Sequence, residues 1–197
     1  MNNTRAEQTR RYSHIGMSSD SNYVYAMQYE KSFNILYDAN EAIDTIALPM
    51  LYSLRHYLEL MLKANIEYFH EFSELDDMVD SGEHKLFPLA HAFEKHWKKV
   101  IEKFNIEIDD AEYFKDLHKL LEIINLLDKN SMGFRYAYSK KTDHKDSEKH
   151  FEWMKQIDVF KIKNLFDKVT PLLNYSIDVF DDKTGLMHGL TKAELLN

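Results

Sequence analysis

Long stretches without helix-breaking residues constrain this chain more than any other feature. Its 197 residues contain only 5 glycines and 3 prolines, the residues that most often end helices or form tight turns. Segments such as 110–128 and 158–180 place large apolar side chains three or four positions apart, which is the spacing of one helix face. The sequence therefore predicts an all-α protein with long helices.

The helical pattern predicts a single-domain bundle of five or six helices. A chain of this length can bury one sizeable core. We expect a flexible polar segment over 1–19 and one bundle over 20–197, in which Asp20 or Ser21 caps the first helix. The expected helices cover about 20–37, 49–72, 87–104, 110–128 and 158–180, with Pro49 in the first turn of the second helix and one more short helix possible in the tail.

Two connections break this pattern. Residues 38–48 are either helical or a tight connection, and both alternatives stay open. After the fourth helix, residues 129–156 combine Gly133, an aromatic run and many charges of both signs. We expect a long irregular loop or a short hairpin there, because loops of this length inside a compact domain usually have a function or move.

Composition excludes several classes of protein. The absence of cysteine excludes disulfides, thiolate metal sites and cysteine nucleophiles, and it fits a reducing compartment. The sequence has neither an apolar run of about 18 residues nor the apolar core of a secretory signal, so we expect a cytoplasmic protein that does not enter a membrane. The formal net charge of −8 argues against binding nucleic acid through bulk charge, although a local basic patch stays compatible with it.

A row of polar residues interrupts the apolar segment SLRHYLELMLKA (53–64). In helical projection, the row falls on an arc of about 100°, opposite a face rich in leucine and methionine; its members are Tyr52, Arg55, His56, Glu59 and Lys63. In one interpretation this arc is solvated, with Glu59 and Lys63 as a favourable i,i+4 pair. In the other it is a buried cluster, in which Glu59 orients Arg55 and leaves His56 for proton transfer or phosphate contact.

A second polar group follows the fourth helix, in the segment SMGFRY (131–136). An arginine between two aromatic residues is usually packed and paired. Arg135 therefore either pairs with an acidic residue and fastens the loop to the bundle, or joins Arg55 to make an anion site. If the second interpretation of both segments is correct, Arg55, His56, Glu59 and Arg135 form one polar cluster in which Arg55 and Glu59 are buried and bonded.

Other candidate sites are weaker. The Glu67-x-x-His70 pair matches half of a di-iron motif, but the chain has no second E-x-x-H. His91 and Glu94 can share a helix face without His96, so we expect no metal and no cofactor. A basic helix edge with Trp97 is either a phosphate contact or a solvated face; its lysines are Lys95, Lys98, Lys99 and Lys103. Glycine-rich phosphate loops and the G-x-S-x-G elbow are absent from the sequence.

Three separated segments resemble a group of bacterial helical proteins that we associate with HEPN-like bundles. YSLRHYLELMLK resembles the helix F-L-x-R-H-x-L-E-L-x-L-K, and LLDKNSMGFRY resembles D-x-x-S-x-x-F-R-Y-P with Ala137 in place of the proline. EHKLFPLAHAFEKHW resembles H-D-L-x-x-L-W, with Lys85 in place of the aspartate and Trp97 further along. The order and rough spacing of the segments agree over about residues 23–175.

The resemblance implies an α-helical bundle that forms homodimers, with an RNA-cleaving site between protomers. HEPN-like proteins are common in prokaryotic toxin and antiviral defence systems, and they are usually encoded beside a partner protein. In their active ribonucleases an arginine and a histidine, with four to six residues between them, support metal-free attack by the 2′-hydroxyl of the RNA. This chain lacks that spacing, since Arg10 to His14 is too short and Arg135 to His144 is too long.

Two functional hypotheses follow. In the first, the chain is an RNA-cleaving or RNA-binding effector without a metal. Its candidate catalytic residues are Arg55, His56 and Glu59, and its candidate binding residues are Lys63, His84, Ser131, Arg135 and Tyr136; Phe134 is a further recurrent position of the resembled group. In the second, the chain is a non-catalytic interaction module that binds a partner protein or a nucleotide-like ligand.

Overall fold

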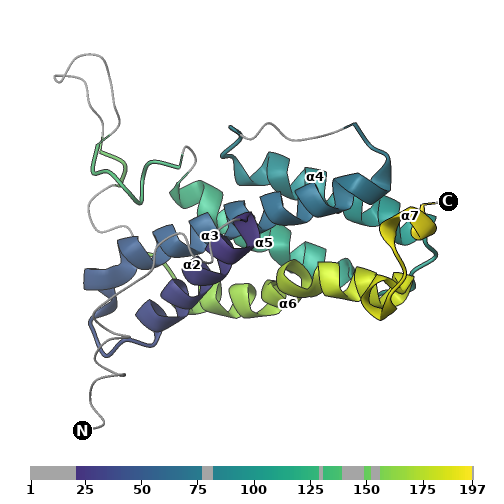
Figure 1. The fold of residues 1–197 in the computed structure, drawn as a ribbon. Coiled ribbons are helices and arrows are strands. Elements are labelled where there is room, and N and C mark those ends of the chain that lie inside the picture. Colours follow the sequence, from purple (N-terminus) through teal and green to yellow (C-terminus); the bar gives the residue numbers. More distant parts are fainter. Residues whose placement is uncertain (1–20, 77–81, 129–130, 139–148, 152–155, 197) are drawn as a thin grey trace, which may run out of the picture.

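The computed structural model describes residues 21–76, 82–128, 131–138, 149–151 and 156–196. The α-helices in these ranges are α2 (Asn22–Tyr37), α3 (Ile43–Ser73), α4 (Leu86–Lys103), α5 (Ala111–Leu127), α6 (Val159–Thr184) and α7 (Lys192–Leu195), and the 3-10 turn η1 (Leu186–His188) follows α6. The described residues contain no strand, so the predicted all-α bundle is confirmed (Figure 1). None of their helices is long and apolar enough to cross a membrane. Residues 1–19, expected to be flexible, lie outside the described ranges.

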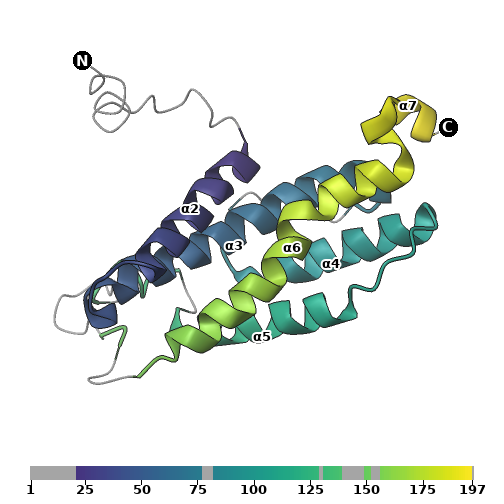
Figure 2. The same cartoon turned by 90° about the horizontal axis from the view of Figure 1, so that it is seen from below.

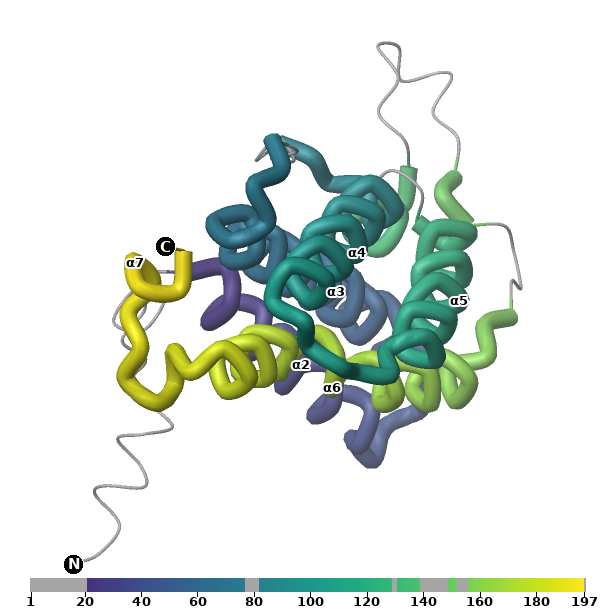
Figure 3. Tube along the Cα trace, turned by 90° about the vertical axis from the view of Figure 1, so that its right-hand side faces the viewer, coloured from purple at the N-terminus to yellow at the C-terminus, as the bar shows by residue number. Residues whose placement is uncertain are grey.

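Helix α3 is the longest element and lies at the centre of the bundle (Figures 2 and 3). It packs against α2, α4 and α6, while α5 packs against α4 and α6. Aromatic residues join three of these helices, since the ring of Phe69 lies 5.2 Å from that of Trp97 and 5.6 Å from that of Phe180. All three side chains have no exposed surface, and burial of such apolar area is the main term that favours folding.

Four of the predicted helices are confirmed to within a few residues. Ser21 caps α2, since its side chain accepts a hydrogen bond from the backbone N–H of Val24. Asp158 caps α6 by accepting from the backbone N–H of Lys161 at 2.8 Å. Helix α6 continues through Pro171 and ends at Gly185, whose φ of 84° is the left-handed conformation that favours glycine. The short α7 lies where one more helix was expected in the tail.

The sequence predicts that the central helix begins at Pro49, and this prediction is wrong. Helix α3 begins at Ile43, so Pro49 lies inside it. The first turn is favoured without Pro49, because Asp44 lies near the positive end of the helix dipole. The Thr45 hydroxyl also donates to the carbonyl of Ala42 at 2.7 Å. Of the two alternatives for 38–48, the helical one is correct from Ile43 onward.

The segment 129–156 after α5, which we call the excursion, is irregular in the residues that the structure describes. Residues 131–138 and 149–151 contain no helix or regular strand, and one antiparallel bridge pairs Tyr138 with Lys149. The backbone N–H of His150 donates to the carbonyl of Ala137 at 3.1 Å. The two arms are therefore paired as in a hairpin. Residues 129–130, 139–148 and 152–155 of the predicted excursion lie outside the described residues.

Candidate functional site

The polar row of α3 faces inward, so the solvated interpretation is wrong for its central members. Arg55 and Glu59 are each only 4% exposed. The Arg55 Nη1 donates to Glu59 Oε2 at 3.2 Å, and Arg55 Nε lies 3.4 Å from Asp128 Oδ2. A buried guanidinium thus lies between two carboxylates, one from its own helix and one from the end of α5.

Two irregular segments complete the surroundings of Arg55. Its Nη2 donates to the backbone carbonyl of His84 at 2.7 Å and also to the hydroxyl of Ser131. The Ser131 hydroxyl lies 3.3 Å from the same carbonyl. Nη1 and Nη2 of Arg55 therefore donate to oxygen atoms of the protein, whereas Nε has an ion-pair contact with Asp128 Oδ2 but no hydrogen bond. Because the side chain is only 4% exposed, its guanidinium contacts protein groups and not solvent.

Glu59 connects the buried arginine to the surface. Its Oε1 accepts from Lys63 Nζ at 3.1 Å and lies 2.8 Å from Nδ1 of His84. Burial alone raises the pKa of the Glu59 carboxyl, but the hydrogen bonds from His84 and Lys63 outweigh it, and the pKa lies below its ordinary value. Glu59 therefore stays ionised at neutral pH and balances the charge of Arg55.

Asp128 holds the start of the excursion as well as Arg55. Its Oδ1 accepts hydrogen bonds from the backbone N–H groups of Met132 and Gly133, both at 2.8 Å. A side chain at Gly133 would crowd this carboxylate, because an added Cβ would lie 3.4 Å from Oδ1. Ser131 adopts the left-handed conformation, with φ of 62°, which turns the chain sharply at this point.

We call this group the charged network; it consists of Arg55, Glu59, Lys63, His84, Asp128 and Ser131. The three segments that resemble HEPN-like proteins all contribute to it, from α3, from the residues just before α4 and from those just after α5. Separated pieces of chain with no regular structure of their own are thereby fixed to the central helix. The predicted burial and bonding of Arg55 and Glu59 is confirmed.

His56 and Arg135 lie beside the charged network rather than in it. The ring of His56 stacks on that of Tyr52, with centroids 5.6 Å apart and planes at 11°, and meets the ring of Tyr29 edge-on at 4.4 Å. The guanidinium of Arg135 also lies over the Tyr52 ring, 6.0 Å from its centre. The sequence predicts one shared polar cluster of Arg55, His56, Glu59 and Arg135. In the structure Arg55 pairs with Glu59, whereas His56 and Arg135 lie beside that pair and both contact the ring of Tyr52.

Arg135 is an exposed cation held by the backbone. Its Nε and Nη2 donate to the carbonyl of Ser131 at 2.8 and 2.5 Å, and no acidic partner is found among the described residues. The acidic partner expected in one interpretation is thus absent from the described residues, and that interpretation stays a prediction because Asp143, Asp146, Glu148 and Glu152 lie outside them. In the other interpretation Arg135 shares an anion site with Arg55, but Arg55 is buried and bonded to other protein groups. Ser131 nevertheless links the two arginines, since its hydroxyl accepts from Arg55 and its carbonyl accepts from Arg135.

The environment of His56 favours its neutral form. Half-burial is the largest cause that lowers the pKa of the imidazole; Glu59 raises that pKa, whereas the positive charges of Arg55, Arg135 and Lys63 lower it further. The net effect is a pKa below the ordinary histidine value. A neutral imidazole at pH 7 can accept a proton, which is what a general base requires.

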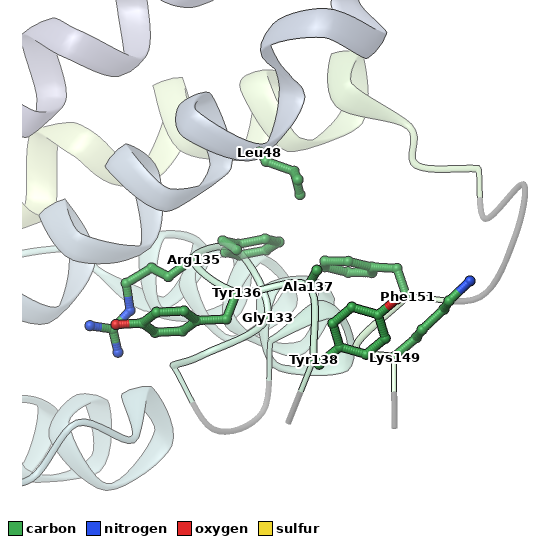
Figure 4. Close-up of a pocket in the computed structure, with 9 residues that line it drawn as sticks. Leu48, Gly133, Arg135, Tyr136, Ala137, Tyr138, Lys149 and Phe151 are labelled. Atoms are coloured by element: carbon green, nitrogen blue, oxygen red, sulfur yellow. The ribbon is translucent and has the colours of Figure 1, made fainter. Parts of the chain in front are cut away.

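A surface pocket of about 280 Å³ opens beside Arg135, between the excursion and the N-terminal part of α3 (Figure 4). Figure 4 shows the side chains of Arg135 and Tyr136 together at one end and those of Tyr138, Lys149 and Phe151 at the other. The rings of Phe134 and Phe151 stack with centroids 6.0 Å apart. The described lining residues include two cations and no acidic group, which suits an anionic ligand with a flat ring.

Sequence reasoning missed several members of these sites. Asp128 ends a predicted helix and is the first residue of the segment that resembles D-x-x-S-x-x-F-R-Y-P, but nothing in the sequence shows that its carboxylate reaches Arg55. Tyr52 belongs to the predicted polar row, but the sequence does not show that the guanidinium of Arg135 lies over its ring. Lys149 and Phe151 come from the far arm of the excursion, whose pairing no local pattern predicts.

The other candidates behave differently. Trp97 has no exposed surface, and on the basic edge of α4 Lys98 pairs with Glu94 and Lys103 with Glu74, which favours the solvated interpretation. Among the described residues, Glu67 and His70 belong to no set of three metal-ligating side chains, whereas one such set does occur and consists of His91, Glu94 and His118.

Comparisons of this chain with protein-family models, with curated proteins and with solved structures found no match. The resemblance of the three segments to HEPN-like bundles therefore stays a prediction.

Proposed function

We propose that this chain binds single-stranded RNA on the surface formed by Tyr52, His56, Arg135 and Tyr136. The observation that carries the proposal is the row in which Arg135 lies over the Tyr52 ring and that ring stacks on His56. Proteins that bind unpaired bases combine such aromatic faces with cations that contact the phosphates. The Nη1 of Arg135 makes no hydrogen bond to a described residue, which leaves it for a phosphate.

The pocket beside this surface supports the same ligand. Its volume of about 280 Å³ is bounded by the rings of Phe134, Tyr136 and Tyr138, with Lys149 at the far end. A nucleotide combines a flat base with a negative phosphate, and this lining offers apolar rings and positive charge. A local patch of this kind also reconciles RNA binding with a net charge of −8, because binding then depends on a few contacts and not on bulk charge.

For cleavage without a metal, His56 and Arg135 are better placed than Arg55. His56 as general base removes the proton of the 2′-hydroxyl, the 2′-oxygen attacks the adjacent phosphorus, and the bond to the 5′-oxygen breaks as that oxygen takes a proton from solvent. Arg135 stabilises the charge on the phosphate. Arg55 and Glu59 are buried and bonded, so we assign them the role of holding the Ser131 segment, with Lys63 and His84 beside them.

This proposal places the chain among HEPN-like effectors of prokaryotic or phage conflict systems, acting in the cytoplasm as a homodimer. Its support is the convergence of the three resembling segments on the charged network and the exposed row beside it. Light scattering of the purified chain measures the oligomeric state, and a mass of one chain contradicts the homodimer.

Fluorescence anisotropy with labelled single-stranded RNA tests the binding site. Loss of one base–aromatic stack costs about 1–3 kcal/mol, so Y136A is expected to weaken binding by about fivefold or more. R135A is expected to weaken binding and to reduce its dependence on salt. The matched control is Y175A, because Tyr175 on α6 is 55% exposed and Tyr136 is 51% exposed. Equal affinities of Y136A, R135A and Y175A overturn the proposed surface.

A cleavage assay separates binding from catalysis. The same RNA is incubated with the wild type and with H56Q, in the presence and absence of EDTA. The proposal predicts cleavage that survives EDTA and that is lost in H56Q even at protein concentrations that saturate the RNA, which compensates for weaker binding by this variant. Intact RNA beside an active control enzyme contradicts the catalytic part and leaves the binding part to the anisotropy measurement.

The second candidate function is a non-catalytic interaction module that binds a partner protein. The observations that favour it are the net charge of −8 and the absence of an arginine and histidine at the spacing of active HEPN ribonucleases. Affinity capture with the wild type and with R135A distinguishes the two candidates when RNA binding is absent. A protein that the wild type retains and R135A loses supports the module.

A further inference from the structure

We propose that His91 and Glu94 of α4 and His118 of α5 bind one divalent transition-metal ion, with Zn²⁺ as the representative ion. One potential ligand atom from each of these side chains lies within 4.8 Å of the others. Two imidazoles and one carboxylate are a ligand set that zinc accepts in proteins. This group shares no residue with the charged network or with the proposed RNA surface.

Two of the three ligand atoms already have a suitable separation. His118 Nε2 lies 3.1 Å from Glu94 Oε2. With metal–ligand distances of about 2.0–2.1 Å, tetrahedral geometry places neighbouring ligand atoms roughly 3.3 Å apart. His91 is exposed, whereas Glu94 and His118 are half-buried. Rotation of the His91 side chain is therefore enough to close the set, and the backbone of the two helices need not move.

The charge of the carboxylate favours a cation. Lys98 Nζ lies 2.5 Å from Glu94 Oε1 and its side chain is 60% exposed, so it can move into solvent. Lys98 thus competes with the metal for Glu94 and is expected to weaken its binding.

Metal binding here would connect two consecutive helices. His91 and Glu94 are three residues apart on α4 and so share a face, and His118 reaches them from the neighbouring α5. The sequence does not indicate this set, because its third member lies on another helix. His96, the other histidine close by on α4, is fully buried. Three protein ligands leave one tetrahedral position for water.

Calorimetric titration of the full-length chain with Zn²⁺ tests the proposal. We expect one site per chain, an increase in Tm on adding Zn²⁺ because the ion binds the folded state, and an affinity at least about tenfold lower in H118Q and in H91Q. The matched control is H188Q, since His188 also contacts a carboxylate, Asp182 at 3.1 Å, but belongs to no set of three ligands in the described residues. K98A is expected to bind Zn²⁺ more tightly than the wild type.

Two results overturn the site. One is the absence of both heat of binding and a change in Tm with Zn²⁺. The other is binding that H91Q and H118Q leave equal to that of H188Q, which assigns the zinc to other histidines. H91Q keeps the test valid if H118Q fails to fold, because His91 is exposed and its replacement leaves the contact between Glu94 and His118 in place.

Discussion

Two buried polar networks lie on the same central helix and differ in what they hold. The charged network joins Arg55 and Glu59 of α3 to Asp128 and to the irregular segments at His84 and Ser131. The second, which we call the amide network, joins Tyr57 and Asn65 of α3 to Asn174 and Ser176 of α6 and extends to Glu30 of α2.

The amide network connects regular helices with mostly uncharged groups. Tyr57 donates to Asn174 at 2.7 Å, and the Asn65 amide donates to the carbonyls of Met61 and Leu173, each at 2.9 Å. Burial raises the pKa of Tyr57 well above its ordinary value, so its hydroxyl remains a donor. Helices α3 and α6 already pack through apolar side chains, and these hydrogen bonds therefore fix how the two faces align.

The charged network instead binds backbone groups of segments that lie outside the helices. The carbonyl of His84 and the N–H groups of Met132 and Gly133 are bonded by its side chains. Hydrogen bonds to charged groups are stronger than neutral ones, which suits segments that bury little apolar surface. Charged side chains therefore act where an irregular segment must be positioned, and the segment positioned in this way carries Arg135.

Removal of the buried cation is expected to have the largest effect. R55A leaves Glu59 and Asp128 buried without their common partner, and breaking a buried ion pair in this way costs about 3–5 kcal/mol. Urea unfolding followed by circular dichroism measures the change in the free energy of unfolding. R55K keeps the positive charge but not all four contacts of Arg55, so its stability is expected to fall between those of R55A and the wild type. Wild-type stability in R55A contradicts the charged network as described.

Loss of an amide from the second network is expected to cost less. N65A removes the donor to Leu173 and leaves the hydroxyl of Ser176 without its acceptor, and an unsatisfied buried group of this kind costs about 1–3 kcal/mol. The same unfolding measurement gives the comparison with R55A. A larger loss in N65A than in R55A reverses the order of the two networks.

The smallest effect concerns pH. Because half-burial chiefly lowers the pKa of His56 in the folded protein, the unfolded chain binds a proton there more readily. The folded state is therefore destabilised as the pH falls below about 6.5, the ordinary histidine value, until the native imidazole also titrates. H56Q lacks this contribution, so its Tm should fall less between pH 7.5 and 5.5. Parallel profiles of H56Q and the wild type show that His56 does not contribute.

Regular features of this fold were predictable from the sequence. Apolar spacing located α2, α4, α5 and α6, because a helix that packs on one side repeats every three to four residues. The same spacing failed at Pro49, since proline is compatible with the first turn of a helix and also occurs inside α3. The burial of Arg55 and Glu59 was predicted because two polar segments, each odd in isolation, have complementary charge and hydrogen-bonding groups.

Contacts between distant segments were not predictable. Helical projection places Tyr52 and His56 near each other but says nothing of Arg135, which reaches Tyr52 only because Ser131 turns the chain. Likewise, His91 and Glu94 were recognised as sharing a face, whereas His118 becomes their neighbour through the packing of α5 on α4. Such contacts depend on tertiary structure, to which local periodicity gives no access.

Amide hydrogen exchange across residues 131–138 tests most directly whether the charged network positions the Arg135 segment. The measurement compares R55K with N65A. The account predicts faster exchange at Met132 and Gly133 in R55K, where the contacts around Asp128 are weakened, and little change there in N65A. In N65A faster exchange is expected in α6 around Leu173. Wild-type exchange at Met132 and Gly133 in R55K would contradict the claim that Arg55 holds this segment.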